Sequence, residues 1–322
     1  MKLTKSQEKK LRKKMKLKSS AEDVFVNMFI SDVKNSIGKK IRNAMTINEV
    51  DEIIENINTK ELSKYIKSLR SKVLKRNNEG FTEIIKAVTS GLDQLKKKKE
   101  DNKKFNKAMT NLIKSQKLVD PLLDKFEYNM SLIKNLPKDV YKLLRKGYME
   151  GKAFRGTEIE SELYERLGNR AKLIVRTESA KVNTAITEVR SRSVGVKAYM
   201  WSTSGDARVR DSHQMLDNVL VFWNDAVTFN YTTQQGSVSS MHGHCGEFPN
   251  CRCIPLAIFD LDDIHFPVRV AEDLIINTKS KNGKELVNIQ SGRIATYTKT
   301  AFLKQYGKLF ISDETELIKL LG

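Results

Sequence analysis

Every histidine and cysteine of this 322-residue chain lies between His213 and His265. The three cysteines fall within ten residues, HCGEFPNCRC at 244–253. Thiols and imidazoles are the side chains that most readily bind soft metal ions or exchange protons near neutral pH. Metal or nucleophilic chemistry in this chain is therefore expected in one short region.

Three interpretations of this cluster are open. Zinc prefers sets of thiolates and imidazoles, so the cysteines and a histidine could bind one structural ion. Without the paired Cys-x-x-Cys knuckles of a zinc ribbon, the alternatives are buried thiols beside hydrogen-bonded imidazoles, or a redox-formed disulfide. The candidate metal ligands are His213, His244, Cys245, Cys251 and Cys253, with His242 as another imidazole within reach and His265 expected at the surface.

A dense group of charges surrounds a predicted turn, and its members are Asp206, Arg208, Arg210, Asp211 and Asp217. Carboxylates beside His213 could hold a metal ion or move protons. We favour a structural ion-pair network, because arginine forks hold carboxylates rigidly and no nucleophile is evident. Arg252 is expected to pair with Asp206 or Asp217, and no catalytic residue is assigned.

Glu178 occupies the apolar stripe of a helix predicted over about residues 170–192. A carboxylate among apolar side chains needs a cationic partner. We expect that partner to be Arg208 or Arg210. A separate helix is predicted from Thr157 to about Gly168, where glycine followed by asparagine is typical of a helix end.

Charged, aromatic and cysteine motifs follow one another in a characteristic order: Arg176-Thr-Glu178, Trp201-Ser-Thr, Asp206-x-Arg208-Val-Arg210-x-x-His213, Leu216-Asp217 and Asn250-Cys-Arg252-Cys253. Over about residues 140–257 this order resembles the Mu F-like family of phage head morphogenesis proteins, also called minor capsid proteins. In two places the chain departs from the family pattern. Asn218 stands where the family usually has glycine, and a His- and Cys-containing stretch replaces a frequent Pro-Gly-Asp segment.

The resemblance implies a protein of the virion, in few copies inside the head or at the portal vertex, and in the host cytoplasm during assembly. The implied partners are phage portal, capsid or scaffold proteins. The implied activity is procapsid assembly, DNA packaging or ejection. No apolar run approaches the roughly 20 residues that span a bilayer, so no membrane anchor is expected.

The net charge of +19 is unevenly distributed. Residues 1–150 hold 36 Lys and Arg against 19 Asp and Glu, a balance of +17, whereas residues 151–322 balance at +2. Such a field attracts polyanions, which favours non-specific DNA binding, although a lysine-rich solvated surface is the alternative. The candidate DNA-binding residues are Lys9, Lys10, Arg12, Lys13, Lys14, Lys16, Lys96, Lys97, Lys98 and Lys99.

Hydrophobic periodicity predicts an α+β protein with four regions. Residues 1–20 form a basic flexible arm and residues 21–138 a helical region of amphipathic segments, with Pro121 and Pro137 at helix starts. Residues 139–260 form an α+β domain with a short mixed or antiparallel sheet. Residues 261–322 form an appendix with a hairpin at Asn282-Gly283 and a terminal helix near 314–321.

The leading hypothesis is thus a phage minor capsid protein whose basic half binds DNA. The alternative is a nucleic-acid-processing or toxin-like enzyme that uses residues 201–253. A third interpretation, a DNA-binding regulator with a metal-stabilised domain, lacks a recognition-helix signature.

Overall fold

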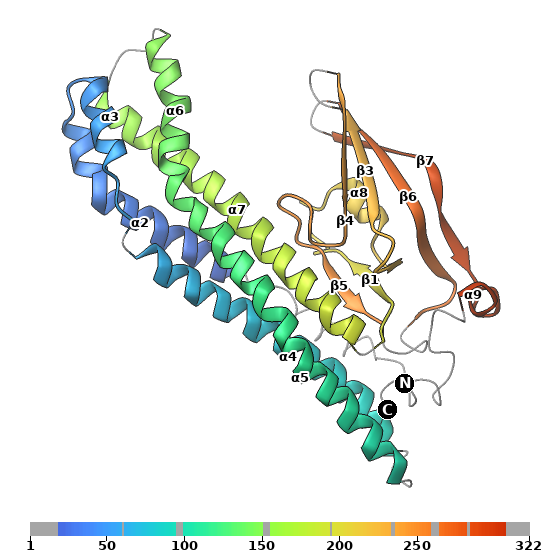
Figure 1. Cartoon of the computed structure of the whole chain (residues 1–322). Coiled ribbons are helices and arrows are strands. Elements are labelled where there is room, and N and C mark those ends of the chain that lie inside the picture. Colours follow the sequence, from blue (N-terminus) through green and yellow to red (C-terminus); the bar gives the residue numbers. More distant parts are fainter. Residues whose placement is uncertain are drawn as a thin grey trace. The chain divides into compact units, whose positions relative to one another are not determined.

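The computed structural model describes residues 19–59, 61–94, 99–150, 155–193, 195–232, 236–258, 264–281 and 284–306, with side chains omitted for 82–94, 99–114 and part of one hairpin. These residues form two compact units. One holds the described parts of 17–74 and 123–179, and the other those of 75–122 and 180–306. The helices and the single mixed sheet confirm the predicted α+β class (Figure 1).

Helices dominate up to residue 193, in the order α2 (Ser19–Asn43), α3 (Ile47–Glu55), α4 (Leu62–Gln94), α5 (Lys99–Ser131), the 3-10 helix η1 (Leu132–Asn135), α6 (Leu136–Met149) and α7 (Gly156–Ser193). The boundary between the units falls inside α4, α5 and α7. None of the described helices combines the length and apolar character required to cross a bilayer.

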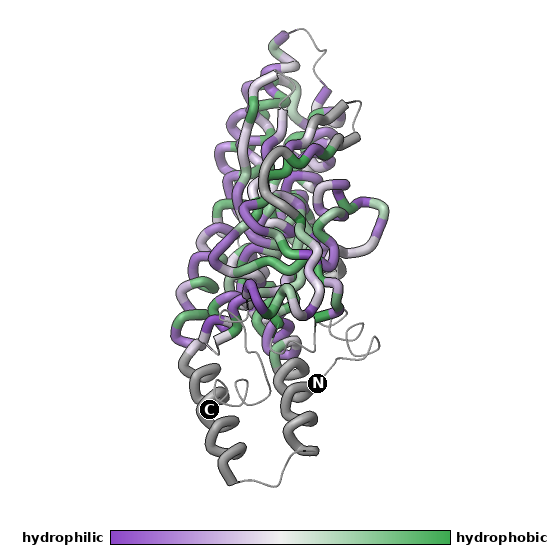
Figure 2. Tube along the Cα trace, turned by 90° about the vertical axis from the view of Figure 1, so that its right-hand side faces the viewer, coloured by the Kyte–Doolittle hydropathy of each residue, from purple (hydrophilic) through white to green (hydrophobic). Residues whose placement is uncertain are grey.

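These helices form because apolar residues recur every three or four positions. In α2 the buried residues Phe25, Phe29, Val33, Ile37 and Ile41 are each four apart, so one face is continuously apolar. Figure 2 shows hydrophilic and hydrophobic residues interleaved along the coloured helices, as amphipathic helices require. The described helices of the N-terminal half therefore fold by burying apolar stripes, while the lysines whose side chains are described lie at or near the surface.

Three predicted helix ends are wrong, because buried stripes continue through them. Apolar spacing within the predicted helical region indicates two amphipathic segments at 62–73 and 81–95, whereas the structure has one helix, α4, over 62–94. Pro121 lies inside α5 rather than at a helix start, between the buried Val119 and Leu123. Packing of this stripe outweighs the cost of the missing N–H. Pro137 does lie at the start of α6, as predicted.

Helix α7 also passes through its predicted break at Gly168. Leu163, Leu167, Ala171 and Val175 are fully buried and four residues apart, so the apolar face keeps its phase across the glycine. The helix begins at Gly156, one residue before the expected N-cap, and the carbonyl of Arg155 accepts the first backbone hydrogen bonds.

The second unit contains one seven-stranded mixed sheet in the order β4-β3-β6-β2-β1-β5, with β7 also paired to β6. Its strands are β1 (Ala198–Ser202), β2 (Val219–Phe222), β3 (Val227–Thr232), β4 (Val238–Gly243), β5 (Ile254–Ala257), β6 (Val268–Lys281) and β7 (Lys284–Tyr297), with short helices α8 (Asp211–Met215) and α9 (Lys299–Tyr306).

The long strand β6 organises this sheet. One edge of β6 pairs with the antiparallel strand β7 along its length. The other edge pairs in parallel first with β2 and then with β3. The pairing shifts register after Glu272, and Asp273 has φ 40°, so an irregularity separates the two parallel pairings. The expected appendix 261–322 thus supplies two strands to the same sheet as the strands before it. The Asn282-Gly283 turn and the predicted terminal helix lie outside the described residues.

Side chains alternate between the two faces of the sheet. Tyr199 and Trp201 of β1 pack in a core with all three cysteines, whereas Ala198 packs on the opposite face with Phe302 of α9. The cysteine region is therefore one half of a two-sided core.

A substitution at Gly168 tests the continuity of α7. No heavy atom lies within 4 Å of an added Cβ there, so Gly168→Ala is expected to raise the free energy of unfolding by about 0.5–1 kcal/mol, as alanine does in helix interiors. Urea denaturation measures this change. Gly156→Ala is the matched control and should destabilise, because its Cβ would lie 2.4 Å from the carbonyl oxygen of Ile41. A lower free energy of unfolding in Gly168→Ala would instead support the predicted helix end at Gly168.

Candidate metal centre and surrounding polar network

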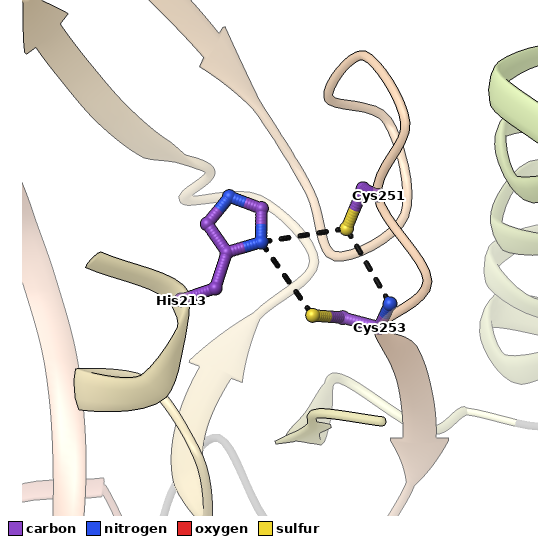
Figure 3. Close-up of side chains that lie close together, drawn as sticks. All are labelled: His213, Cys251 and Cys253. Atoms are coloured by element: carbon purple, nitrogen blue, oxygen red, sulfur yellow. Dashed lines mark hydrogen bonds between the residues drawn. The ribbon is translucent and has the colours of Figure 1, made fainter. Parts of the chain in front are cut away.

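The centre of the site is one imidazole facing two thiols (Figure 3). Nδ1 of His213, on α8, lies 3.5 Å from Sγ of Cys251 and 3.5 Å from Sγ of Cys253. The three potential ligand atoms lie within 4.8 Å of one another, and all three residues are buried. The backbone N–H of Cys253 also points to the sulfur of Cys251, at 3.4 Å.

Cys245 joins this group through Cys253. A side-chain hydrogen bond to Cys245 is the largest cause of the raised pKa of Cys253, while burial raises the pKa of Cys245 to about 11. The pKa of Cys251 is also raised, first by its hydrogen bond with Cys253 and then by burial. All three thiols are free and buried, so without a metal ion they are protonated near neutral pH.

The other three histidines have different hydrogen-bond partners or surroundings. His244 is buried, but its Nδ1 is 3.2 Å from the hydroxyl of Tyr199, and burial lowers its pKa. The Tyr199 hydroxyl in turn accepts the backbone N–H of Cys245. His242 is exposed and hydrogen-bonds Thr228, and His265 is exposed as predicted. His213 is therefore the imidazole beside the thiols.

Aromatic rings surround His213. Their centroids lie 5.6 Å away for Trp201, 5.3 Å for Phe229 and 5.5 Å for Phe248. A pocket of about 560 Å³ opens beside the same imidazole and is lined in part by Arg210, Asp211 and Tyr231. Ala207 and residues 209–213, within the charged motif, line one side of this pocket, and β3 supplies Phe229, Tyr231 and Thr232 from a distant part of the chain.

The predicted ion pair of Arg252 is present, with Asp206 as its partner. The guanidinium donates to both carboxylate oxygens, through Nη1 to Oδ2 and through Nη2 to Oδ1 at 2.7 Å. The pKa of Asp206 is consequently lowered, with the hydrogen bond from Arg252 as the largest cause. Arg208 approaches the same carboxylate at 3.5 Å, and Arg210 donates to the carbonyl of Pro249 at 2.6 Å.

Asp217, the other expected partner of Arg252, accepts hydrogen bonds from Thr203 instead. Its Oδ1 accepts the backbone N–H of Thr203 at 2.8 Å and the Thr203 hydroxyl at 2.9 Å, which closes the loop after β1. The next residue, Asn218, has φ 59°. Asparagine tolerates this left-handed conformation better than most residues, which explains how it can stand where the family usually has glycine.

The two helical motif residues belong to the other compact unit. Arg176 pairs with Glu22 at 3.3 Å, and Asn129 donates to Glu178 at 2.7 Å. The described hydrogen-bond partner of Glu178 is thus an amide, and its expected pairing with Arg208 or Arg210 stays a prediction.

Contacts of the C-terminal third of α7 were not predicted. The Thr184 hydroxyl donates to the carbonyl of Cys245 at 2.5 Å, and an added Cβ on Gly246, whose φ is 91°, would meet the same hydroxyl. Arg190 donates to Asn77 at 2.6 Å, and burial lowers the pKa of this arginine to about 10. These residues carry no recognisable motif, because polar residues on a helix are common at its surface.

The candidate DNA-binding residues lie outside what the structure describes. Lys9 to Lys16 and Lys96 to Lys98 fall in undescribed segments, and Lys99 begins α5 without a described side chain. The basic arm predicted at 1–20 is therefore described only for its last two residues.

The fold and the site define a small α+β module with a buried His–Cys cluster. Residues 138–255 match the family model described as Phage Mu protein F like protein, and the predicted resemblance is confirmed over that region. This match covers a little over a third of the chain and indicates phage head morphogenesis in general terms.

A curated relative from Haemophilus influenzae, described as an uncharacterized protein, is 37% identical over 91 residues. The alignment covers 28% of this chain and 18% of the relative. No solved structure matches the chain.

The Asp206–Arg252 pair can be tested with a double-mutant cycle. Asp206→Asn and Arg252→Gln should each lower the free energy of unfolding by about 1 kcal/mol or less, because the carboxylate is 37% exposed. The double variant should lose little more than either single one. Urea denaturation at pH 7 measures all four proteins, and a coupling energy of zero would contradict a structural pair.

The same pair predicts a pH dependence. Because the folded-state pKa of Asp206 is lowered, its contribution is complete above the unfolded-state pKa of about 3.9 and is lost as pH falls towards the folded-state value. The stability difference between the native chain and Asp206→Asn should therefore shrink below about pH 4. A difference that grows on acidification would contradict this sign.

Proposed function

We propose that this chain is a phage minor capsid protein that acts in head morphogenesis, in procapsid assembly, DNA packaging or ejection near the portal. The observation that supports this most is the family match over residues 138–255, where the ordered motif and the fold coincide. Portal, capsid or scaffold proteins are the proposed partners, and the head interior or portal vertex the proposed location.

The basic N-terminal half is proposed to bind DNA through phosphates without reading sequence. Its balance of +17 supports this role, since lysines on amphipathic helices remain exposed after folding. Exposed lysines in described helices include Lys34, Lys39 and Lys40 on α2 and Lys64 and Lys67 on α4. Contacts to phosphates alone suit a packaged genome of any sequence.

The alternative is a nucleic-acid-processing enzyme that uses residues 201–253, and the pocket beside His213 is the feature that favours it. Against it, Asp206 is held by Arg252 and Asp217 by Thr203, so both carboxylates have structural partners. Asp206→Ala and His213→Ala separate the two functions. Folded variants that lose a nuclease or transferase activity would favour the enzyme, whereas unfolding would favour the structural network.

DNA binding by the full chain should depend steeply on salt. Affinity for a duplex of arbitrary sequence is expected to fall by about 10³-fold or more between 50 and 200 mM salt if six or more phosphates are contacted. Fluorescence anisotropy with two unrelated duplexes measures this. Replacing Lys96, Lys97, Lys98 and Lys99 with glutamine should weaken binding and flatten the salt slope for both duplexes.

The matched control replaces four exposed lysines of the second half, Lys181, Lys197, Lys299 and Lys304, and should change affinity much less. Equal losses of DNA affinity in both variants would contradict a special role of the N-terminal half. A full chain without affinity at low salt would exclude DNA binding and leave protein partners.

Assembly itself is tested in the phage or prophage that encodes the chain. Deleting the gene should reduce the yield of DNA-filled heads in electron micrographs, and supplying the native gene should restore it. Normal numbers of filled, infectious particles without the gene would contradict the proposed function.

A further inference from the structure

We infer that His213, Cys251, Cys253 and Cys245 form a closed structural zinc site within the core of the sheet-containing unit. This site is independent of the proposed role in phage heads, because it follows from the side-chain positions alone. Its ligands would be Nδ1 of His213 and the three sulfurs, a Cys3His set of the kind that holds structural zinc.

The distances fit a metal ion at the centre of the cluster. Zinc lies about 2.0–2.1 Å from an imidazole nitrogen and about 2.3 Å from a thiolate, and a tetrahedral angle then places nitrogen and sulfur about 3.5 Å apart. Both nitrogen–sulfur distances at His213 are 3.5 Å. The third ligand-to-ligand distance, between the sulfurs of Cys251 and Cys253, is within 4.8 Å.

Hydrogen bonding alone explains this arrangement less well. The imidazole Nδ1 offers one lone pair or one hydrogen in the ring plane, so it can make one good hydrogen bond. It nevertheless lies at the same distance from two sulfurs. A metal ion placed between them uses the lone pair and both sulfurs at once.

The surroundings suit a closed structural site rather than an open one. The cysteines are at most 4% exposed, and the rings of Trp201 and Phe248 pack against the imidazole, which also lines the neighbouring pocket. The backbone N–H of Cys253, 3.4 Å from the sulfur of Cys251, can stabilise a metal-bound thiolate from outside the ligand shell. Cys245 is the proposed fourth ligand because it is buried in the same core cluster as Cys251 and Cys253. The three ligand atoms that lie within 4.8 Å of one another do not include its sulfur, so this side chain would move inward when the ion binds.

Zinc would connect segments that the sheet does not connect. His213 lies on the short helix α8, and the cysteines lie in the irregular stretch between β4 and β5. Binding replaces the three thiol protons, which pass to solvent, with one ion, so affinity falls on acidification. No change of oxidation state is involved.

The direct test is the metal content of the full chain, purified without chelator and measured by inductively coupled plasma mass spectrometry. One zinc per chain is expected. Cobalt(II) exchanged into the native chain should show the intense visible bands of a tetrahedral thiolate site together with sulfur-to-cobalt charge transfer. This second measurement needs no variant, so it holds even if substitutions prevent folding.

Variants then identify the ligands. Cys251→Ser, Cys253→Ser and His213→Ala should lose the metal, and Cys245→Ser should weaken the charge-transfer band because one sulfur–cobalt bond is lost. His242→Ala is the matched control, since its exposed imidazole hydrogen-bonds Thr228, and it should keep one zinc per chain. Retention of metal in Cys251→Ser would overturn the assignment.

Removal of zinc by a strong chelator should lower the Tm of the native chain by about 5 °C or more, because metal binding and folding are coupled. Re-addition should restore it. A folded native chain that contains no metal, takes up neither zinc nor cobalt, and has three titratable thiols would overturn the proposal in favour of a thiol core. A disulfide between two of the three cysteines in the freshly purified chain would also overturn the zinc-site proposal.

Discussion

The contact of one imidazole nitrogen with two sulfurs holds together the parts of the sheet-containing unit that lack backbone pairing. Strands β1 to β7 are positioned by their hydrogen bonds, but α8 and the stretch at 244–253 are not. Their contacts include the His213–cysteine cluster and the hydrogen bonds of Thr184 and Tyr199 to the backbone of Cys245. Arg210 and Arg252 add hydrogen bonds to Pro249 and Asp206. These contacts matter because the groups are buried, and an unpaired polar group in a core is costly.

The residues of the family motif are thus explained by the contacts with which they hold the fold. Asp206 is held by Arg252, Asp217 closes the loop at Thr203, and Asn218 supplies a left-handed turn. Each of these residues fixes backbone that the sheet leaves free. The excess positive charge, in contrast, belongs to residues 1–150. Structural and electrostatic roles are thus assigned to different parts of the chain.

Much of the fold could be predicted, and the failures have physical reasons. Hydrophobic periodicity correctly predicted a helical region at 21–138, which includes α2 and α3, since burial of one face decides helix formation. Helix ends at Gly168 and Pro121 were wrong, because local propensity was outweighed by a buried stripe on both sides. The place of β6 within the sheet could not be predicted, because parallel pairing with β2 and β3 joins strands far apart in the chain.

For the site, the residue types predicted which side chains would cluster, but they did not predict which partner each side chain would contact. The Cys-x-Cys motif and His213 were predicted together, and Arg252 was predicted to bind a nearby aspartate. Sequence could not choose His213 over His244, because the decision depends on Tyr199, which offers its hydroxyl to the second imidazole. Nor could it find Thr184 or the pocket beside His213, which arise from elements that meet only in the folded chain.

X-ray absorption at the zinc edge of the purified full chain tests the central claim most directly. A closed site predicts a shell of three sulfurs at about 2.3 Å and one nitrogen at about 2.0–2.1 Å. The His213→Ala variant, which is expected to lose the metal, should show no zinc edge. A spectrum without a zinc edge, or a shell made mainly of oxygen, would contradict a metal centre formed by His213 and the three cysteines.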